Sequence, residues 1–145
     1  MSARGPGTVV RTTLLFLFVP ALACSSLEPD SIRALGYIAG FGFASPQVRI
    51  PDTVQARVDF TVSVNTFGGG CFAAGDTEVS IDGFEAVVSP YDIERRRGTC
   101  STVLRVFEHG ATIRFEQAGT GFVTIRGRTA PGGGTISVRR AITVE

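Results

Sequence analysis

The chain of 145 residues contains no lysine and no tryptophan, and it has a single histidine, His109. All 14 basic residues are therefore arginines, and together with 13 acidic residues they leave a formal net charge of +1. A chain with this balance lacks the basic face that nucleic-acid binding needs, and one histidine cannot serve a mechanism that needs two. With 43% hydrophobic and 19% charged residues, the composition excludes a disordered chain and a polytopic membrane protein, and the length fits one domain.

A short, uncharged and mostly apolar run, residues 12–23, lies near the N-terminus and follows Arg4 and Arg11. It has about 12 residues, whereas a helix that spans a bilayer needs about 20. The run ends on the small residues Ala21 and Ala23 around Leu22. A positive start, a short apolar stretch and a small-residue end predict a secretory signal peptide over residues 1–23.

Cys24 follows this segment directly, and residues 21–24, Ala-Leu-Ala-Cys, resemble the lipobox of bacterial lipoproteins. Ala21 stands where that family usually has leucine. The resemblance implies that Cys24 becomes the lipidated first residue of the mature chain, that residues 24–35 form a tether, and that Ser25 favours the outer membrane. Several acyl chains would hold the protein stably on a membrane. Plain secretion, with Cys24 as an ordinary thiol, is the alternative interpretation.

Cys71 and Cys100 are the remaining cysteines. In an exported chain such a pair predicts a disulfide, and closing a loop of this length stabilises the fold by about 3–4 kcal/mol in the chain-entropy model. A zinc site is disfavoured, because these two cysteines and His109 make three soft ligands without the close spacing of zinc motifs.

The body of the chain shows no sustained helical period from Tyr37 onward, and apolar residues alternate with polar ones instead. Turn-forming residues separate these segments, and His109-Gly110 predicts a hairpin between residues 102–108 and 111–116. Residues 31–35 fit either one helical turn or an extended lead-in. The pattern predicts antiparallel sheets, each buried on one face, in an all-β sandwich of about 7–9 strands. The alternating apolar residues are Phe60, Val62, Val64, Val79, Ile81, Ile113, Phe115, Val123, Ile125, Ile136, Val138, Ile142 and Val144.

Residues 51–64, PDTVQARVDFTVSV, resemble the opening of a bacterial immunoglobulin-like domain, although Arg57 stands where that family has glycine. Residues 115–125, FEQAGTGFVTI, resemble its later corner, with Phe122 in place of a tyrosine. The resemblance covers roughly residues 48–145. It implies an immunoglobulin-like β-sandwich over residues 36–145. The positions of the cysteines differ from the antibody pattern, which predicts that their bridge ties loops together rather than joining the two sheets.

Catalytic chemistry has few candidates. His109 beside a glycine predicts an exposed turn residue, and no serine lies in a Gly-x-Ser-x-Gly elbow. Two pairs of carboxylates fit solvated strand ends, and no dense acidic loop is present for calcium. The sequence therefore predicts no catalytic residue, no metal and no cofactor. These pairs are Asp76 with Glu78 and Asp92 with Glu94.

Three consecutive arginines, Arg95, Arg96 and Arg97, form the strongest local charge feature and lie between Tyr91 and Cys100. We expect a binding surface, if the domain has one, on the loops of residues 67–72 and 91–100, which the disulfide joins and which include Tyr91 and the three arginines. The arginines could grip an acidic glycan, a lipid phosphate or a carboxylate of a partner through bidentate contacts. The alternative is a solvated loop whose charge is balanced by Asp92 and Glu94.

These observations predict a non-enzymatic, lipid-anchored module of the cell envelope. We expect it on the outer membrane, facing the periplasm or the surface, with a structural role or a role in binding a protein or an anionic glycan. The alternative is a small periplasmic inhibitor or accessory subunit that acts through the disulfide-tied loop. A hydrolase is the weakest hypothesis.

Overall fold

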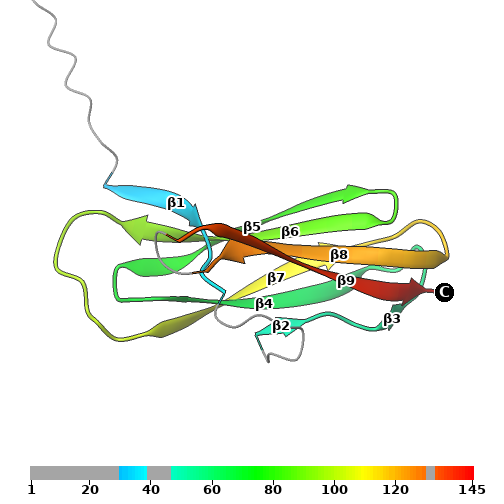
Figure 1. The fold of residues 1–145 in the computed structure, drawn as a ribbon, viewed down its shortest axis with the longest axis horizontal. Helices are drawn as coiled ribbons and strands as arrows, with labels where there is room; N and C mark the ends of the chain where they lie inside the picture. Colours follow the sequence, from blue (N-terminus) through cyan, green and yellow to red (C-terminus); the bar gives the residue numbers. More distant parts are fainter. Residues whose placement is uncertain (1–29, 39–46, 130–132) are drawn as a thin grey trace, which may run out of the picture.

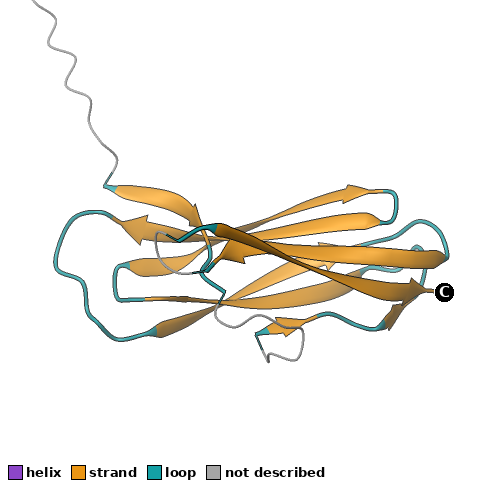
Figure 2. Cartoon of the chain, viewed as in Figure 1, coloured by secondary structure: helices purple, strands orange, loops and turns teal. Residues whose placement is uncertain are grey.

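The computed structural model describes residues 30–38, 47–129 and 133–145, and these form strands and no helix (Figures 1 and 2). The predicted signal peptide and Cys24 lie outside the described residues. The strands are β1 (Ser31–Leu35), β2 (Val48–Arg49), β3 (Thr53–Val54), β4 (Phe60–Gly68), β5 (Phe72–Asp82), β6 (Glu85–Arg95), β7 (Arg105–Ile113), β8 (Gly119–Arg128) and β9 (Thr135–Val144).

The strands make two sheets, which confirms the predicted sandwich-like, all-β architecture. The larger sheet has the order β1-β6-β8-β9-β3, with β5 on the other side of β6, and the smaller sheet has the order β2-β4-β7. Strand β6 is long enough for β1 and β8 to share one of its edges, β1 along residues 91–95 and β8 along residues 85–88. The C-terminus lies at the opposite end of the sandwich from the start of β1 (Figure 1).

The larger sheet is mixed, which corrects the prediction of purely antiparallel sheets. Strand β8 is parallel to β6, and β3 is parallel to β9. After β6 the chain crosses to the smaller sheet as β7 and then returns as β8. Such a crossover delivers the next strand in the same direction, which a tight hairpin cannot do.

The core lies between the facing sides of the sheets. The predicted alternation is confirmed in β4, where Val62 and Val64 are fully buried, and in β8, where Val123 and Ile125 are. Fully burying one such side chain stabilises the fold by roughly 1.5–3 kcal/mol. The buried apolar residues are Ile38, Ile50, Val54, Val62, Val64, Ala86, Val88, Ala111, Ile113, Phe115, Val123, Ile125, Ile142 and Val144.

The alternation in β5 does not mark a buried face, so that part of the core prediction is wrong. Val79 and Ile81 are 37% and 44% exposed. Strand β5 pairs only with β6 among the described strands, so it forms an edge of the larger sheet. Val79 and Ile81 lie opposite the core residues Val88 and Ala86 in the ladder, so the period gave the core face of the sheet, but this end of the edge strand is left exposed.

Two local predictions also change. Of the two alternatives for residues 31–35, the extended one agrees with the structure, but the segment is part of the larger sheet as β1, in which Leu35 pairs with Tyr91 of β6. The predicted hairpin at His109-Gly110 is wrong, because β7 runs through both residues and Gly110 pairs with Ser63 in the ladder. The ladder to β4 continues on both sides of this glycine, so it causes no turn.

Candidate functional site

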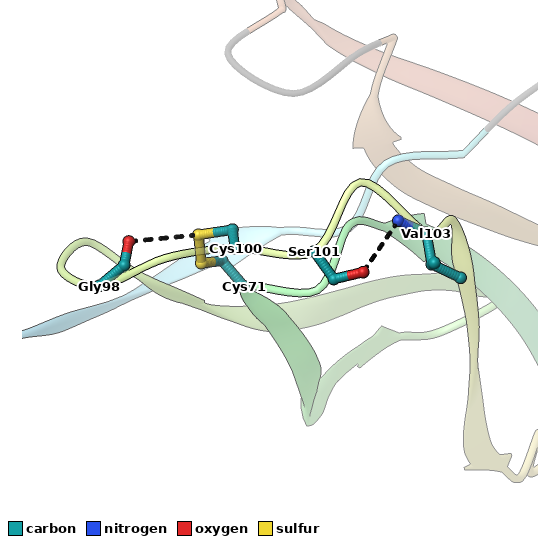
Figure 3. The surroundings of a disulfide bond; sticks show 5 residues. All are labelled: Cys71, Gly98, Cys100, Ser101 and Val103. Carbon is teal, nitrogen blue, oxygen red and sulfur yellow. Dashed lines mark hydrogen bonds between the residues drawn. A yellow bond between two sulfur atoms is a disulfide. The ribbon is translucent and has the colours of Figure 1, made fainter.

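The disulfide joins two connections at one end of the sandwich, as the sequence predicts. Cys71 lies between β4 and β5, Cys100 lies between β6 and β7, and their Cα atoms are 5.0 Å apart (Figure 3). The Gly70 N–H donates to the Ser101 carbonyl at 2.8 Å, and any Cβ on Gly70 would overlap Ser101. The glycine therefore permits the close approach that brings the two connections within reach of the bond. The bridge ties loops, as expected, and not the centres of the sheets.

The three arginines lie where the chain leaves β6. Arg95 is the last residue of the strand, and Arg96 and Arg97 are exposed beyond it. The predicted balancing by Asp92 is wrong, because Asp92 is fully buried. Arg97 instead lies 3.2 Å from the carboxylate of Asp30, and the backbone N–H of Arg96 donates to the Asp30 carbonyl at 2.8 Å. This end of the sandwich therefore also receives the N-terminal segment.

Tyr91 is not part of the loop. It lies within β6, and the guanidinium of Arg33, from β1, lies 3.3 Å from the centre of its ring. Arg33 reaches across β6 to β5, where it pairs with Asp76 at 2.7 Å and Glu78 at 2.8 Å. The hydrogen bond from Arg33 lowers the pKa of Asp76, and the same bond raises the pKa of Arg33. Arg33 thus covers Tyr91 and fastens β1 to the sheet, so the structure does not unite Tyr91 with the three arginines.

Exposed apolar residues lie in the loop before β7 and at the start of that strand. Val103 and Leu104 of the loop are 63% and 66% exposed, and Val106 of β7 is 56% exposed. The Val103 N–H donates to the Ser101 hydroxyl at 3.2 Å, which fixes the chain next to the disulfide (Figure 3). The available signal was Val103-Leu104 next to a loop cysteine, where a buried side chain would not be expected. The predicted hairpin at His109-Gly110 instead placed the pair in a strand over residues 102–108.

A groove of about 330 Å³ opens beside this loop. Its apolar lining includes Phe72 and Ile93, and Arg95 and Arg105 contribute two positive charges. Among the described residues, neither arginine has a carboxylate within ion-pair distance, although Glu94 neighbours Arg95 in sequence. The groove therefore combines apolar walls with uncompensated positive charge.

His109 is buried rather than exposed, which corrects the sequence prediction. It is 3% exposed, on β7, and its Nε2 lies 3.0 Å from both Asp92 Oδ1 and Thr66 Oγ1. Thr66 also donates to Asp92 Oδ1 at 3.0 Å, and Thr77 Oγ1 lies 3.3 Å from His109 Nδ1. Four strands supply these side chains, so no local pattern could reveal the cluster.

The cluster contains a carboxylate, an imidazole and hydroxyls, which are the groups of a nucleophilic relay. In a relay the acid holds one ring nitrogen and the nucleophile contacts the other. Here Asp92 and Thr66 lie at Nε2, and the half-buried Thr77 hydroxyl lies 3.3 Å from Nδ1, so Asp92, His109 and Thr77 follow the order of a relay. Asp92, His109 and Thr66 are at most 3% exposed. The arrangement fits a buried polar network that joins the sheets, since hydrogen bonding offsets the cost of burying each group.

In the described part of the chain, no group of three or more His, Cys, Asp or Glu side chains is arranged to hold a metal ion. Within the same residues there is no helix with the length and apolar character of a membrane span. Comparisons with protein-family models, with curated proteins and with solved structures found no match.

Proposed function

We propose that this protein is a non-enzymatic, lipid-anchored module of the bacterial cell envelope, with an immunoglobulin-like domain held on the outer membrane. The observation that carries the proposal is the position of Asp30, the first described residue. It lies six residues after Cys24 and contacts Arg96 and Arg97 at the disulfide-tied end. An acylated Cys24 would thus hold this end near the membrane and leave the opposite end free.

The immunoglobulin-like assignment is supported by the turn at residues 55–58. The Val58 N–H donates to the Gln55 carbonyl at 3.4 Å, and Arg57 has φ of 64°. A positive φ at the third turn position favours glycine, which is the residue that the family pattern has there. The parallel pair β6–β8 departs from the two antiparallel sheets of immunoglobulin domains.

The non-enzymatic assignment is supported by the burial of His109. The single imidazole of the chain is 3% exposed, and its two nitrogens already contact Asp92, Thr66 and Thr77. The exposed acidic pair Asp76 and Glu78 is held by Arg33.

A second candidate is an inhibitor or accessory subunit that uses the loop between β6 and β7. The disulfide favours it, because a loop that is already ordered loses less entropy on binding. Changing Arg95, Arg96 and Arg97 to serine and repeating a pull-down from envelope extract tests this candidate. An unchanged set of partners would argue against the loop as a protein contact.

The anchoring itself is tested by mass spectrometry of the mature protein from membranes. We expect an N-terminal Cys24 that carries acyl chains, and a Cys24→Ala variant that appears in the soluble fraction. A mature chain without fatty acid, or membrane association that survives Cys24→Ala with no acyl chain present, would contradict the proposal.

A further inference from the structure

We infer that the disulfide-tied end of the sandwich is itself a bilayer-contacting surface, in which Val103 and Leu104 enter the headgroup region and Arg95, Arg96 and Arg105 bind lipid phosphates. We call these five residues the lipid-facing tip. The inference rests on the proposed anchoring and adds to it, because an anchor alone leaves the orientation of the domain unspecified.

The length of the tether brings the lipid-facing tip to the membrane. Asp30 is six positions after Cys24, and a fully extended chain spans at most about 3.6 Å per residue, or about 20 Å in total. The backbone N–H of Arg96 donates to Asp30, so the tip begins where the tether ends. The opposite end lies about 30 Å further away, the length of a nine-residue strand such as β4. The tether therefore keeps the tip within about 20 Å of the bilayer.

The apolar part of the lipid-facing tip suits the boundary between headgroups and acyl chains. Val103 and Leu104 are adjacent and more than 60% exposed, beside a disulfide and a hydrogen bond to Ser101 that hold their backbone. Adjacent exposed apolar residues on an ordered loop can enter a membrane interface at little cost in conformational entropy.

The charges of the lipid-facing tip complement an anionic surface. Arg97 is occupied by Asp30, whereas Arg95, Arg96 and Arg105 have no ion-pair partner within the described residues, and Glu94 is the nearby acid in sequence. Arg95 and Arg105 line one groove together with Phe72 and Ile93. A phosphate between two guanidinium groups, with an acyl chain on the apolar lining, matches this combination.

The other end of the sandwich provides the matched control. Val58 is 50% exposed and precedes β4, whereas Leu104 is 66% exposed and precedes β7. In the antiparallel pairing of β4 with β7, Phe60 lies opposite Ile113 and Gly68 lies opposite Arg105, so Val58 and Leu104 mark opposite ends. Val58 lies between Arg57 and Asp59, so the two neighbours of this control residue carry opposite charges.

Tryptophan reporters test the inference, because the chain has no tryptophan of its own. Leu104→Trp and Val58→Trp would each be prepared in the mature chain with Cys24→Ala, exported through an ordinary secretory signal so that the disulfide forms. Vesicles of phosphatidylglycerol and phosphatidylethanolamine should shift the emission of the Leu104→Trp reporter to shorter wavelength and leave that of the Val58→Trp reporter unchanged. Arg95→Ser with Arg105→Ser in the same chain should weaken vesicle binding by about 30-fold, at roughly fivefold for each arginine.

The same reporters in the acylated protein separate this inference from the proposed anchoring. Brominated lipids should quench the Leu104→Trp reporter far more than the Val58→Trp reporter. Equal quenching in protein whose Cys24 is shown to be acylated, or an unshifted Leu104→Trp spectrum with the anionic vesicles, would overturn the inference and leave the anchoring intact. Absence of acyl chains on Cys24 would overturn the anchoring, and the unacylated chain with vesicles would still decide the inference.

Discussion

His109 Nε2 lies 3.0 Å from Asp92 Oδ1, and the two side chains are 1% and 0% exposed. Asp92 Oδ2 has no hydrogen-bond partner among the described residues, so this carboxylate depends on the contacts of its other oxygen with His109 and Thr66. Removing one partner from a buried pair leaves a group that neither water nor protein satisfies, and such changes are among the most destabilising.

We therefore expect His109→Leu to lower the free energy of unfolding by about 3–5 kcal/mol. Urea denaturation followed by circular dichroism measures the change. Replacing Asp92 by leucine together with His109 should recover part of the loss, because the uncompensated carboxylate is then gone. Thr112→Leu, on the exposed side of β7, is the control and should change stability by less than about 0.5 kcal/mol. Equal losses of unfolding free energy in His109→Leu and Thr112→Leu would contradict a stabilising role for the buried hydrogen bonds of His109.

The disulfide should be a larger contributor to stability than any exposed ion pair. Its 29-residue separation gives about 3–4 kcal/mol in the chain-entropy model. The double variant Cys71→Ser with Cys100→Ser should lose about this amount in thermal or urea unfolding, while its far-ultraviolet spectrum stays that of a β protein. Loss of the β spectrum would mean that the bridge is needed to form the fold and not only to stabilise it.

Arg57 is the non-glycine residue with positive φ in the described part of the chain, at 64°. Side chains strain the backbone in this region, and glycine does not. Arg57→Gly should therefore raise the free energy of unfolding by about 0.5–1 kcal/mol, net of the greater freedom of glycine in the unfolded chain. Arg57→Ala keeps a Cβ and should give no such gain. A destabilised Arg57→Gly protein would show that the arginine side chain makes contacts that matter more than its backbone.

The pairing of Asp76 with Arg33 should appear in the dependence of stability on pH. The hydrogen bond from Arg33 holds the pKa of Asp76 below its ordinary value of 3.8. A carboxyl whose pKa is lower in the folded state stabilises the fold fully above its unfolded pKa, and this contribution disappears as the pH falls through the folded pKa. An NMR titration of the Asp76 carboxyl should therefore show a depressed pKa in the wild type and an ordinary one in Arg33→Gln. An unchanged pKa in the variant would assign the shift to another group.

The contacts of Arg33 also hold the strand to which the predicted lipid anchor is connected. Arg33 fastens β1 to β6 and β5, and β1 is the strand that follows the predicted tether. In Arg33→Gln, hydrogen exchange at the amides of β1 should become faster, whereas exchange in β4 should not change. A single exposed ion pair contributes little to global stability, so the effect belongs to local opening.

The sequence by itself determined the all-β class, the pairing of Cys71 with Cys100 and the buried positions of β4 and β8. These features follow from the alternation of apolar and polar residues along the chain and from the small number of cysteines, both of which are visible in the sequence. The tertiary structure alone decided the rest. It buried His109 and Asp92 by bringing β7 against β6, exposed Val79 and Ile81 because β5 is an edge, and placed Asp30 against Arg97. A period of two says that a strand has two faces, but only the arrangement of the sheets decides which face is covered and which polar groups meet inside it.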